Sequence, residues 1–374
     1  MKKKKIMVIY GTRPEAIKMA PVINRFKKEK NINVSVCVTA QHREMLDQIN
    51  SWFNIDADYD LNLMKDNQFI SEITADALRE IENILSIEKP DIILVEGDTT
   101  TAFVGALAAF YQKIPIGYLE SGLRTWNKYS PYPEEINRVL ISHLADLHFA
   151  PTQMSKRNLE MENIKSKNIF VTGNTVIDAL FNTIERFDKD YLLGNNKKIS
   201  LKNKFILVTV HRRENFGEPL KNICLAIKEL VQKEKIEAEI IIPVHLNPNV
   251  RGIVFALLRN IPNIHLVDPL NYPVFCNLMA KSYLILTDSG GIQEEAPSLG
   301  KPVLVLRENT ERPEGVNAGT VRIVGRKKEN IIKEVKNLIE NKKAYIKMSK
   351  AKNPYGDGHS SERIIKTILR FLND

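Results

Sequence analysis

A glycine-rich turn within residues 286–296 carries the residue types best suited to binding an anion. An apolar run leads into it and a helical pattern follows, and the turn itself consists of Ser289, Gly290 and Gly291. Unpaired N–H groups at a helix N-terminus attract negative charge, and glycines let a phosphate approach the backbone. Of Glu294 and Glu295, one can complement the helix dipole and the other can bind a sugar diol. The pattern indicates either a phosphate site or an ordinary helix start.

Carboxylates follow other apolar runs. Asp98 precedes three threonines and suits helix capping or catalysis. Glu120 ends an apolar run, where partial desolvation raises a carboxyl pKa and favours acid or base chemistry. Glu134 and Glu135 begin a helical pattern after two prolines, so helix capping is the simplest role for one of them.

Cationic side chains occur at similar positions. His211 stands directly before Arg212 and Arg213, an arrangement that favours an anion-stabilising cluster over a packed histidine. Arg13 follows the first apolar run in the same way. Arg312 is consistent with either a phosphate ligand or a surface ion pair.

Short β-rich runs alternate with helical patterns through the chain, which is typical of parallel sheets covered by helices on both faces. Strands are predicted at residues 6–10, 34–39, 92–96, 116–119, 147–149, 169–171, 205–210, 239–242, 264–267, 284–287 and 303–305. Helices are predicted at residues 14–30, 43–53, 70–87, 101–112, 134–145, 153–163 and 360–372.

The domain division is predicted from a break in this alternation. A polar, charged stretch at residues 187–204 interrupts the pattern before it restarts. We expect residues 1–172 to form a first domain that carries the carboxylates, with the helix of residues 359–374 packing back on it, and residues 173–358 to form a second. Ligands of parallel sheets bind at the carboxyl ends of the strands, and most of the residues named above follow predicted strands.

Composition limits the class of protein. The 374 residues are 43% hydrophobic and 26% charged, and no apolar run approaches the roughly 20 residues of a membrane span. The net charge is +9, but the lysines and arginines are interleaved with acidic residues along the chain. This pattern favours solvated helix faces over a nucleic-acid-binding surface. Three cysteines among apolar neighbours indicate no disulfide framework and fit a cytoplasmic setting.

Common cofactor motifs do not occur. Neither a G-x-G-x-x-G dinucleotide fingerprint nor a G-x-x-x-x-G-K-[ST] phosphate loop is present. His143 and His148 have no companion ligands at metal spacing, so no metal site is predicted. Two α/β domains, one with a phosphate turn and one with several carboxylates, indicate a nucleotide-sugar ligand.

Several motifs together resemble the non-hydrolysing UDP-N-acetylglucosamine 2-epimerases. They occur in the family's order and run nearly end to end: GTRPEAIK at residues 11–18, TAQHR at 39–43, GDTT at 97–100, ESGLRT at 120–125, PEEINR at 133–138, GNT at 173–175, HRRE at 211–214, DSGGIQEE at 288–295 and NPYGDG at 353–358. The resemblance implies two Rossmann-like domains facing across a cleft, the glycosyltransferase B type. It also implies interconversion of UDP-GlcNAc and UDP-ManNAc without a cofactor, in a homodimer.

The resemblance also implies roles for individual residues. Asp98, Glu120 and Glu134 match the family's acid/base carboxylates, and His211 matches its essential histidine. The matches to its substrate ligands are Arg13, Lys18, Asp98, Glu120, His211, Leu270, Phe275, Ser289, Gly290, Gly291, Glu295 and Arg312. Gln41 and His42 match part of an activating UDP-GlcNAc site.

Three alternatives differ from the epimerase in what happens at the sugar. A hydrolysing relative would release free ManNAc, and a glycosyltransferase of the same fold would need an acceptor groove, which the sequence does not indicate. A nucleotide-sugar sensor should lack one of the four catalytic candidates, and all four are present.

Overall fold

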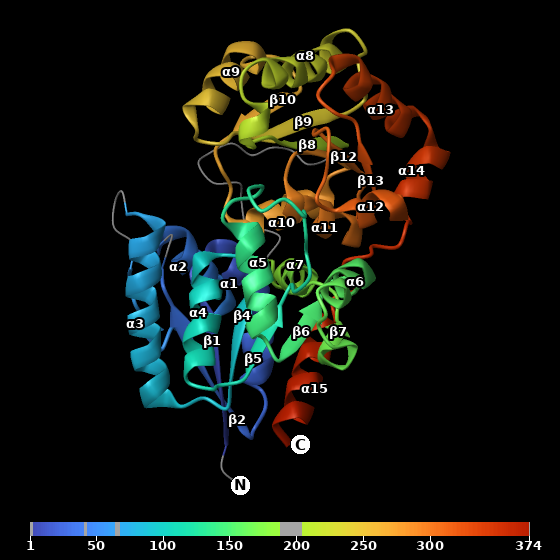
Figure 1. Ribbon diagram of the computed structural model, residues 1–374. Coiled ribbons are helices and arrows are strands. Elements are labelled where there is room, and N and C mark those ends of the chain that lie inside the picture. Colours follow the sequence, from blue (N-terminus) through green and yellow to red (C-terminus); the bar gives the residue numbers. More distant parts are fainter. Residues whose placement is uncertain (1–2, 41–42, 64–67, 188–203, 374) are drawn as a thin grey trace. The chain divides into compact units, whose positions relative to one another are not determined.

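The computed structural model describes residues 3–40, 43–63, 68–187 and 204–373, which pack into two compact units (Figure 1). Unit 1 comprises Met1–Asn182 and Tyr355–Asp374, and unit 2 comprises Thr183–Pro354. The predicted interruption at residues 187–204 lies largely outside the described residues, as do Gln41 and His42.

Unit 1 is built on a seven-stranded parallel sheet with the order β3-β2-β1-β4-β5-β6-β7. Its strands are β1 (Lys4–Tyr10), β2 (Ile32–Val38), β3 (Tyr59–Asp60), β4 (Ile92–Glu96), β5 (Ile116–Leu119), β6 (Leu147–Ala150) and β7 (Ile169–Val171). The central strands are continuous apolar runs because helices bury both faces. Strand β3 was not predicted, because two residues are too few to show an alternating pattern.

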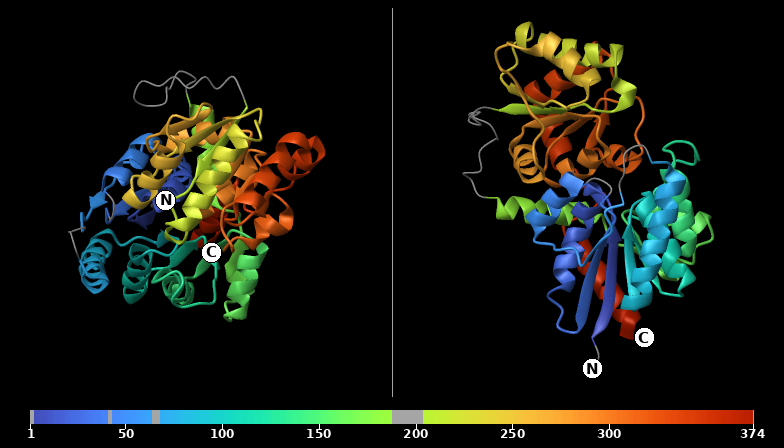
Figure 2. Two further views of the ribbon diagram at one scale, coloured as in Figure 1. Left: turned by 90° about the horizontal axis from the view of Figure 1, so that it is seen from above. Right: turned by 90° about the vertical axis from the view of Figure 1, so that its left-hand side faces the viewer.

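Helices cover both faces of this sheet (Figures 1 and 2). They are α1 (Arg13–Phe26), α2 (Arg43–Phe53), α3 (Ile70–Glu88), α4 (Thr100–Tyr111), α5 (Glu134–Leu144), α6 (Gln153–Met161), α7 (Thr175–Arg186) and α15 (Ser360–Asn373). Helix α1 ends at Phe26, four residues before the predicted end at Lys30. The C-terminal helix α15 packs beside α1.

Unit 2 is built on a six-stranded parallel sheet with the order β10-β9-β8-β11-β12-β13. Its strands are β8 (Phe205–Thr209), β9 (Glu239–Pro243), β10 (Ile264–Val267), β11 (Leu284–Thr287), β12 (Val303–Val305) and β13 (Val321–Ile323), of which the sequence analysis missed β13. Its helices are α8 (Glu218–Gln232), α9 (Pro248–Leu258), α10 (Tyr272–Lys281), α11 (Gly290–Ser298), α12 (Pro313–Ala318), α13 (Lys328–Glu340) and α14 (Lys342–Ser349).

Two parallel α/β units confirm the predicted fold class. In each sheet the strand order reverses direction once, between β1 and β4 in unit 1 and between β8 and β11 in unit 2. Such reversal points leave room for a ligand at the carboxyl ends of the strands. The domain boundary predicted at residue 172 stays a prediction. Within the described ranges, no helix combines the length and apolarity needed to cross a membrane.

Candidate functional site

The loop after β1 in unit 1 is organised by the buried carboxylate of Glu15. Its Oε2 accepts hydrogen bonds from the backbone N–H groups of Gly11 at 3.1 Å and Thr12 at 2.7 Å. Its Oε1 accepts a bond from the Thr99 hydroxyl at 2.6 Å. Burial raises the pKa of Glu15, while these hydrogen bonds lower it. Glu15 therefore ties the loop after β1 to the loop after β4.

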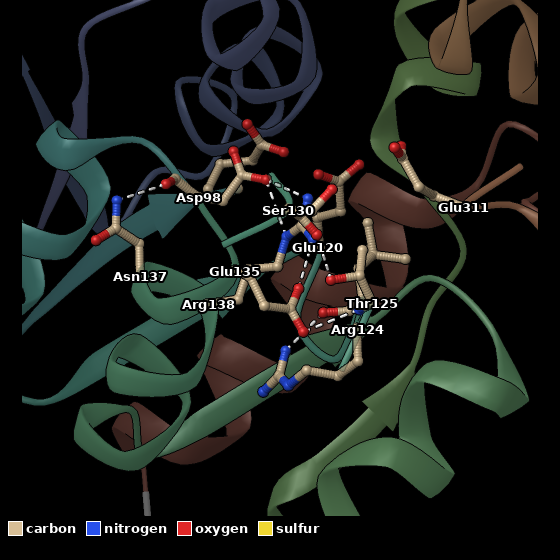
Figure 3. Close-up of polar contacts among 12 residues, drawn as sticks. Asp98, Glu120, Arg124, Thr125, Ser130, Glu135, Asn137, Arg138 and Glu311 are labelled. Carbon is tan, nitrogen blue, oxygen red and sulfur yellow. Dashed lines mark hydrogen bonds and ion pairs between the residues drawn. The ribbon is translucent and has the colours of Figure 1, made fainter. Parts of the chain in front are cut away.

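Asp98 lies in the loop after β4 and does not cap the helix that follows. Thr99 is the N-cap of α4 and accepts a bond from the Ala102 N–H at 3.1 Å. The Asp98 Oδ2 accepts two bonds from Arg138, from Nε at 2.9 Å and Nη2 at 2.6 Å (Figure 3). Asn137 donates to the Asp98 carbonyl at 2.9 Å. The capping interpretation is thus wrong, and Asp98 is instead held by α5.

Glu120 follows β5 with its backbone in the left-handed region, at φ 58°. Non-glycine residues adopt this conformation uncommonly, and it occurs often at functional sites. Its Oε1 accepts bonds from Lys18 Nζ at 2.7 Å and from Asn174 Nδ2 at 2.8 Å. Lys18 also donates to Glu96 Oε1 at 2.7 Å. Glu120, one of the predicted acid/base carboxylates, therefore lies in a buried ionic cluster.

Glu134 and Glu135 have different surroundings at the start of α5. Glu135 accepts bonds from the backbone N–H groups of Thr125 and Trp126, both at 2.9 Å, and from Arg138 Nη1 at 2.9 Å (Figure 3). The Oε2 atom of Glu134 is buried and has no hydrogen-bond partner among the described residues. Glu135 therefore orders the loop, while Glu134 keeps an oxygen available to a ligand.

In unit 2, a fully buried aspartate organises the reversal point between β8 and β11. Asp288 Oδ2 accepts bonds from the backbone N–H groups of His211 at 2.9 Å and Arg212 at 2.8 Å, and from Asn215 Nδ2 at 2.9 Å. The Nδ1 of His211 lies 3.2 Å from Asp288 Oδ1. The Nδ1 edge of the ring is therefore turned toward Asp288, and Nε2 is the nitrogen on the opposite edge.

The His211 imidazole is partly buried and is stacked on His245, with ring centroids 5.8 Å apart. Burial lowers the pKa of His211 below its usual 6.5, and Asp288 opposes this shift. The positive charge of Arg212 and the nearby His245 lower the pKa further. Without a ligand, the ring is therefore neutral at neutral pH.

The N-terminus of α11 has the features of an anion site. Ser289 is the N-cap, and its side chain makes no capping bond. A methyl group at Gly290 would come within 2.8 Å of Arg312 Nη1 and 2.9 Å of Arg312 Cζ, so the guanidinium packs directly on this glycine. Arg312 also donates through Nε to the buried Glu294. The arginine is therefore held beside the N-terminus of α11. The Ser289 N–H, expected to be unpaired, donates to Thr287 Oγ1 at 3.0 Å.

The remaining predicted ligands lie in helices of the two units or directly beside them. Arg13 begins α1 in unit 1. In unit 2, Leu270 lies just before α10, Phe275 lies within that helix, and both are half-buried. Glu295 is buried in α11, one residue after the partner of Arg312.

Sequence reasoning assigned no role to several residues of these clusters. Glu96 ends a buried strand just as Glu120 follows one, and this shared position was the available signal. Arg138 and Asn174 lie within the motifs at residues 133–138 and 173–175, but no role was assigned to them. Arg307 follows β12 and bonds to Glu214 at 2.6 Å, and no local pattern distinguishes it from a surface arginine.

Comparison with known proteins gives a consistent match. A sequence model of a family described as UDP-N-acetylglucosamine 2-epimerase matches residues 24–369. The UDP-N-acetylglucosamine 2-epimerase of Campylobacter jejuni is 54% identical over 379 residues, covering 99% of both chains. The crystal structure of UDP-GlcNAc 2-epimerase from Neisseria meningitidis bound to UDP-GlcNAc has a TM-score of 0.90 at 54% identity, covering 98% of this chain and 100% of that chain.

A more distant structure bears on the fold alone. The crystal structure of the glycotransferase of kitacinnamycin has a TM-score of 0.67 at 11% identity and covers 100% of both chains. Together with the two parallel sheets, these similarities confirm the predicted glycosyltransferase B type of fold.

Proposed function

The chain belongs to the UDP-N-acetylglucosamine 2-epimerase family, and from that premise we propose that it interconverts UDP-GlcNAc and UDP-ManNAc by eliminating and re-adding UDP. The observation that carries this proposal is that charged groups collect at the reversal point of each sheet. Carboxylates gather in unit 1, whereas unit 2 has an open helix N-terminus, an arginine and a histidine. The first set suits proton transfer and the second suits a diphosphate.

The chemistry of the sugar explains why UDP must leave. The C2 hydrogen of an N-acetylhexosamine has no adjacent carbonyl, so direct removal by a base is implausible. In an elimination, a base takes the C2 proton while the C2–H electron pair forms the C1–C2 double bond and the C1–O bond breaks. The products are 2-acetamidoglucal and UDP. Re-addition of UDP to C1, with protonation of the opposite face of C2, gives the epimer.

We assign the proton transfers to Asp98, Glu120 and Glu134 in unit 1. Asp98 is paired with Arg138 and Glu120 with Lys18, and Glu134 has a buried oxygen with no partner in the described part of the chain. A base on one face and an acid on the other are needed, since inversion delivers the proton to the face opposite the one it left. Arg138, Lys18 and Asn174 orient the carboxylates.

We assign the leaving diphosphate to unit 2. The N–H groups of Gly290 and Gly291 and the Ser289 hydroxyl, with Arg312 and His211, would stabilise the negative charge that develops as the C1–O bond breaks. Phe275 and the backbone at Leu270 would lie at the uracil, with Glu295 on the ribose. Arg13 would complete the phosphate contacts from unit 1.

Incorporation of solvent hydrogen tests this mechanism. UDP-GlcNAc incubated with the protein in D2O should yield UDP-ManNAc with deuterium at C2, followed by NMR. Glu120→Gln should abolish the exchange while UDP binding changes little, because Glu120 is not among the groups assigned to the diphosphate, the ribose or the uracil. Free ManNAc as product would indicate the hydrolysing alternative, and absence of exchange at C2 would refute elimination.

Further parts of the proposal follow from family membership. We propose a homodimer, a cytoplasmic setting consistent with three buried free cysteines, and a supply of UDP-ManNAc to polysaccharide synthesis. Activation by UDP-GlcNAc at Gln41 and His42 also stays a prediction. Full conversion of UDP-ManNAc with no UDP-GlcNAc added would contradict it.

A further inference from the structure

Two carboxylates in unit 1 share one ammonium group. Lys18 Nζ lies 2.7 Å from Glu96 Oε1 and 2.7 Å from Glu120 Oε1. The three side chains come from three segments: Lys18 from α1, Glu96 from the end of β4, and Glu120 from the residue after β5. Strands β4 and β5 pair in parallel with Glu96 opposite Leu119, so the two carboxylates emerge at the same edge.

This cluster is poorly hydrated. The side chains of Glu96, Glu120 and Lys18 are 2%, 7% and 16% exposed. With both carboxylates ionised, the cluster carries a net charge of −1 in a region of low dielectric constant, and like charges at this spacing repel strongly. A single proton on one carboxylate removes that charge.

Glu96 is the carboxylate suited to hold that proton. Burial raises its pKa well above 4.5, Lys18 opposes the shift, and the charge of Glu120 raises the pKa again. Glu15 of α1 is the other acidic group that acts on it, and it also raises the pKa. Glu120, in contrast, has Asn174 as a second donor to the same oxygen that binds Lys18. Arg138 of α5 and the buried Tyr118 of β5 also interact electrostatically with Glu120.

We propose that Glu96 is a positioning residue for the epimerisation, which holds the Lys18 ammonium against Glu120 and sets the protonation state of Glu120 through this shared cation. The inference rests on the proposed function. Glu96 itself is too deeply buried to act on a sugar, so its influence passes through Lys18. The protonated form of Glu96 leaves Lys18 as the counter-ion of an ionised Glu120.

The pH profile of the reaction tests this role. Glu96→Gln reproduces the neutral acid and keeps an acceptor for Lys18, so the limb of the kcat/KM profile that Glu120 controls should stay where it is in the wild type. Glu96→Leu removes the acceptor, so Lys18 is held less firmly against Glu120. In that variant kcat should fall about tenfold or more, and the limb should move by about one pH unit toward alkaline pH.

Glu88→Gln provides the matched control. Glu88 also pairs with a lysine of unit 1, with Lys5 Nζ at 3.5 Å, but it lies outside the cluster. Its variant should keep the wild-type profile. With an active wild type, a profile that is unchanged in Glu96→Leu, or one that is displaced in Glu96→Gln, overturns this inference alone. A wild type that does not convert UDP-GlcNAc overturns the proposed function and this inference with it.

Stability supplies a readout independent of turnover. Because the folded-state pKa of Glu96 is raised, its contribution to stability is greatest below pH 4.5 and is lost as pH rises through the folded pKa. Glutamine does not titrate, so the Tm of Glu96→Gln minus that of the wild type should increase from pH 4.5 to pH 8. A difference that does not change with pH would overturn the inference.

Discussion

At the residue scale, the same side-chain type has different roles according to its surroundings. Glu15, Glu96 and Glu135 are buried and make bonds within the protein, whereas Glu134 has a buried oxygen without a partner in the described chain. Hydrogen bonds and cations favour the ionised carboxylate, and burial favours the neutral acid. Position after a strand does not identify a catalytic carboxylate, because structural carboxylates occupy such positions too. The contacts of each carboxylate are needed to assign its role.

His211 gives a prediction about protons. Burial lowers its pKa in the free protein, and a bound diphosphate should raise it by favouring the imidazolium. Binding of UDP at pH 7 should therefore take up a proton, on the order of 0.3 to 1 per site. Isothermal titration calorimetry in buffers of different ionisation enthalpy measures this uptake.

Two variants isolate the histidine. His211→Gln should lose the proton uptake that is due to the imidazole. The β-phosphate of UDP contributes equally in both proteins, so subtracting the uptake of the variant from that of the wild type leaves the contribution of His211. His265→Gln is the control, since His265 lies on β10 and bonds to Glu239 at 2.7 Å. Equal uptake by the wild type and His211→Gln would show that His211 does not adjoin the diphosphate.

At the element scale, the ends of strands and helices bring the charged groups together. In both sheets, the residues after the two strands that flank the reversal point bond to each other: Thr99 to Glu15 in unit 1, and His211 to Asp288 in unit 2. Helix α11 begins at this edge, and the side chain of its N-cap residue, Ser289, accepts no hydrogen bond from the first N–H groups of the helix. Such a helix start concentrates positive potential where a phosphate can approach.

Gly290→Ala tests the role of that helix start. The new methyl group would come 2.8 Å from Arg312 Nη1, so the guanidinium must move away from the turn. Because the new methyl group meets the end of a side chain and no backbone atom, we expect a stability loss of only about 1 kcal/mol. Affinity for UDP, measured by calorimetry, should fall about threefold to tenfold because one charged contact is displaced.

Gly252→Ala in α9 is the control for this prediction. A methyl group there would meet no heavy atom within 4 Å, so UDP affinity should not change. Wild-type affinity in Gly290→Ala would argue that α11 begins with a structural glycine turn and that Arg312 does not contact the ligand.

At the scale of the whole molecule, the chain leaves unit 1, forms unit 2 and returns to unit 1 at Tyr355. Asp178 of α7 joins the two parts of unit 1, accepting bonds from the Ser360 N–H at 3.2 Å and from the Ser361 N–H and hydroxyl at 2.8 and 2.6 Å. These donors begin α15, so Asp178 supplies the carboxylate that the start of this helix needs.

Asp178→Ala should therefore destabilise unit 1. The substitution removes the buried acceptor of three donors, which are the Ser360 N–H, the Ser361 N–H and the Ser361 hydroxyl. We therefore expect the free energy of unfolding to fall by about 2 to 4 kcal/mol. Denaturant unfolding monitored by circular dichroism measures this change. Asp357→Asn is the control, because the partly exposed Asp357–Arg363 pair should contribute less than about 1 kcal/mol. Equal losses in the two variants would contradict the role of Asp178.

The sequence by itself determined the fold class, because the alternation of apolar runs with helical patterns is a local feature that can be recognised without knowing which residues are in contact. Motif order also determined the family. Strand bounds such as those of β4 and β5 were predicted as observed, whereas two-residue β3 and the edge strand β13 were missed.

Only the tertiary structure decided which charged residues act together. Lys18 lies 78 residues from Glu96 and 102 from Glu120 in the chain, and Asp98 lies 40 from Arg138. Parallel strand pairing brings such distant segments to one sheet edge, and burial then makes their charges interact strongly. From the sequence, helix capping was therefore one interpretation of Asp98, because its partner Arg138 is distant in the chain. Glu96 had no predicted role, because its contact with Lys18 exists only in the folded chain.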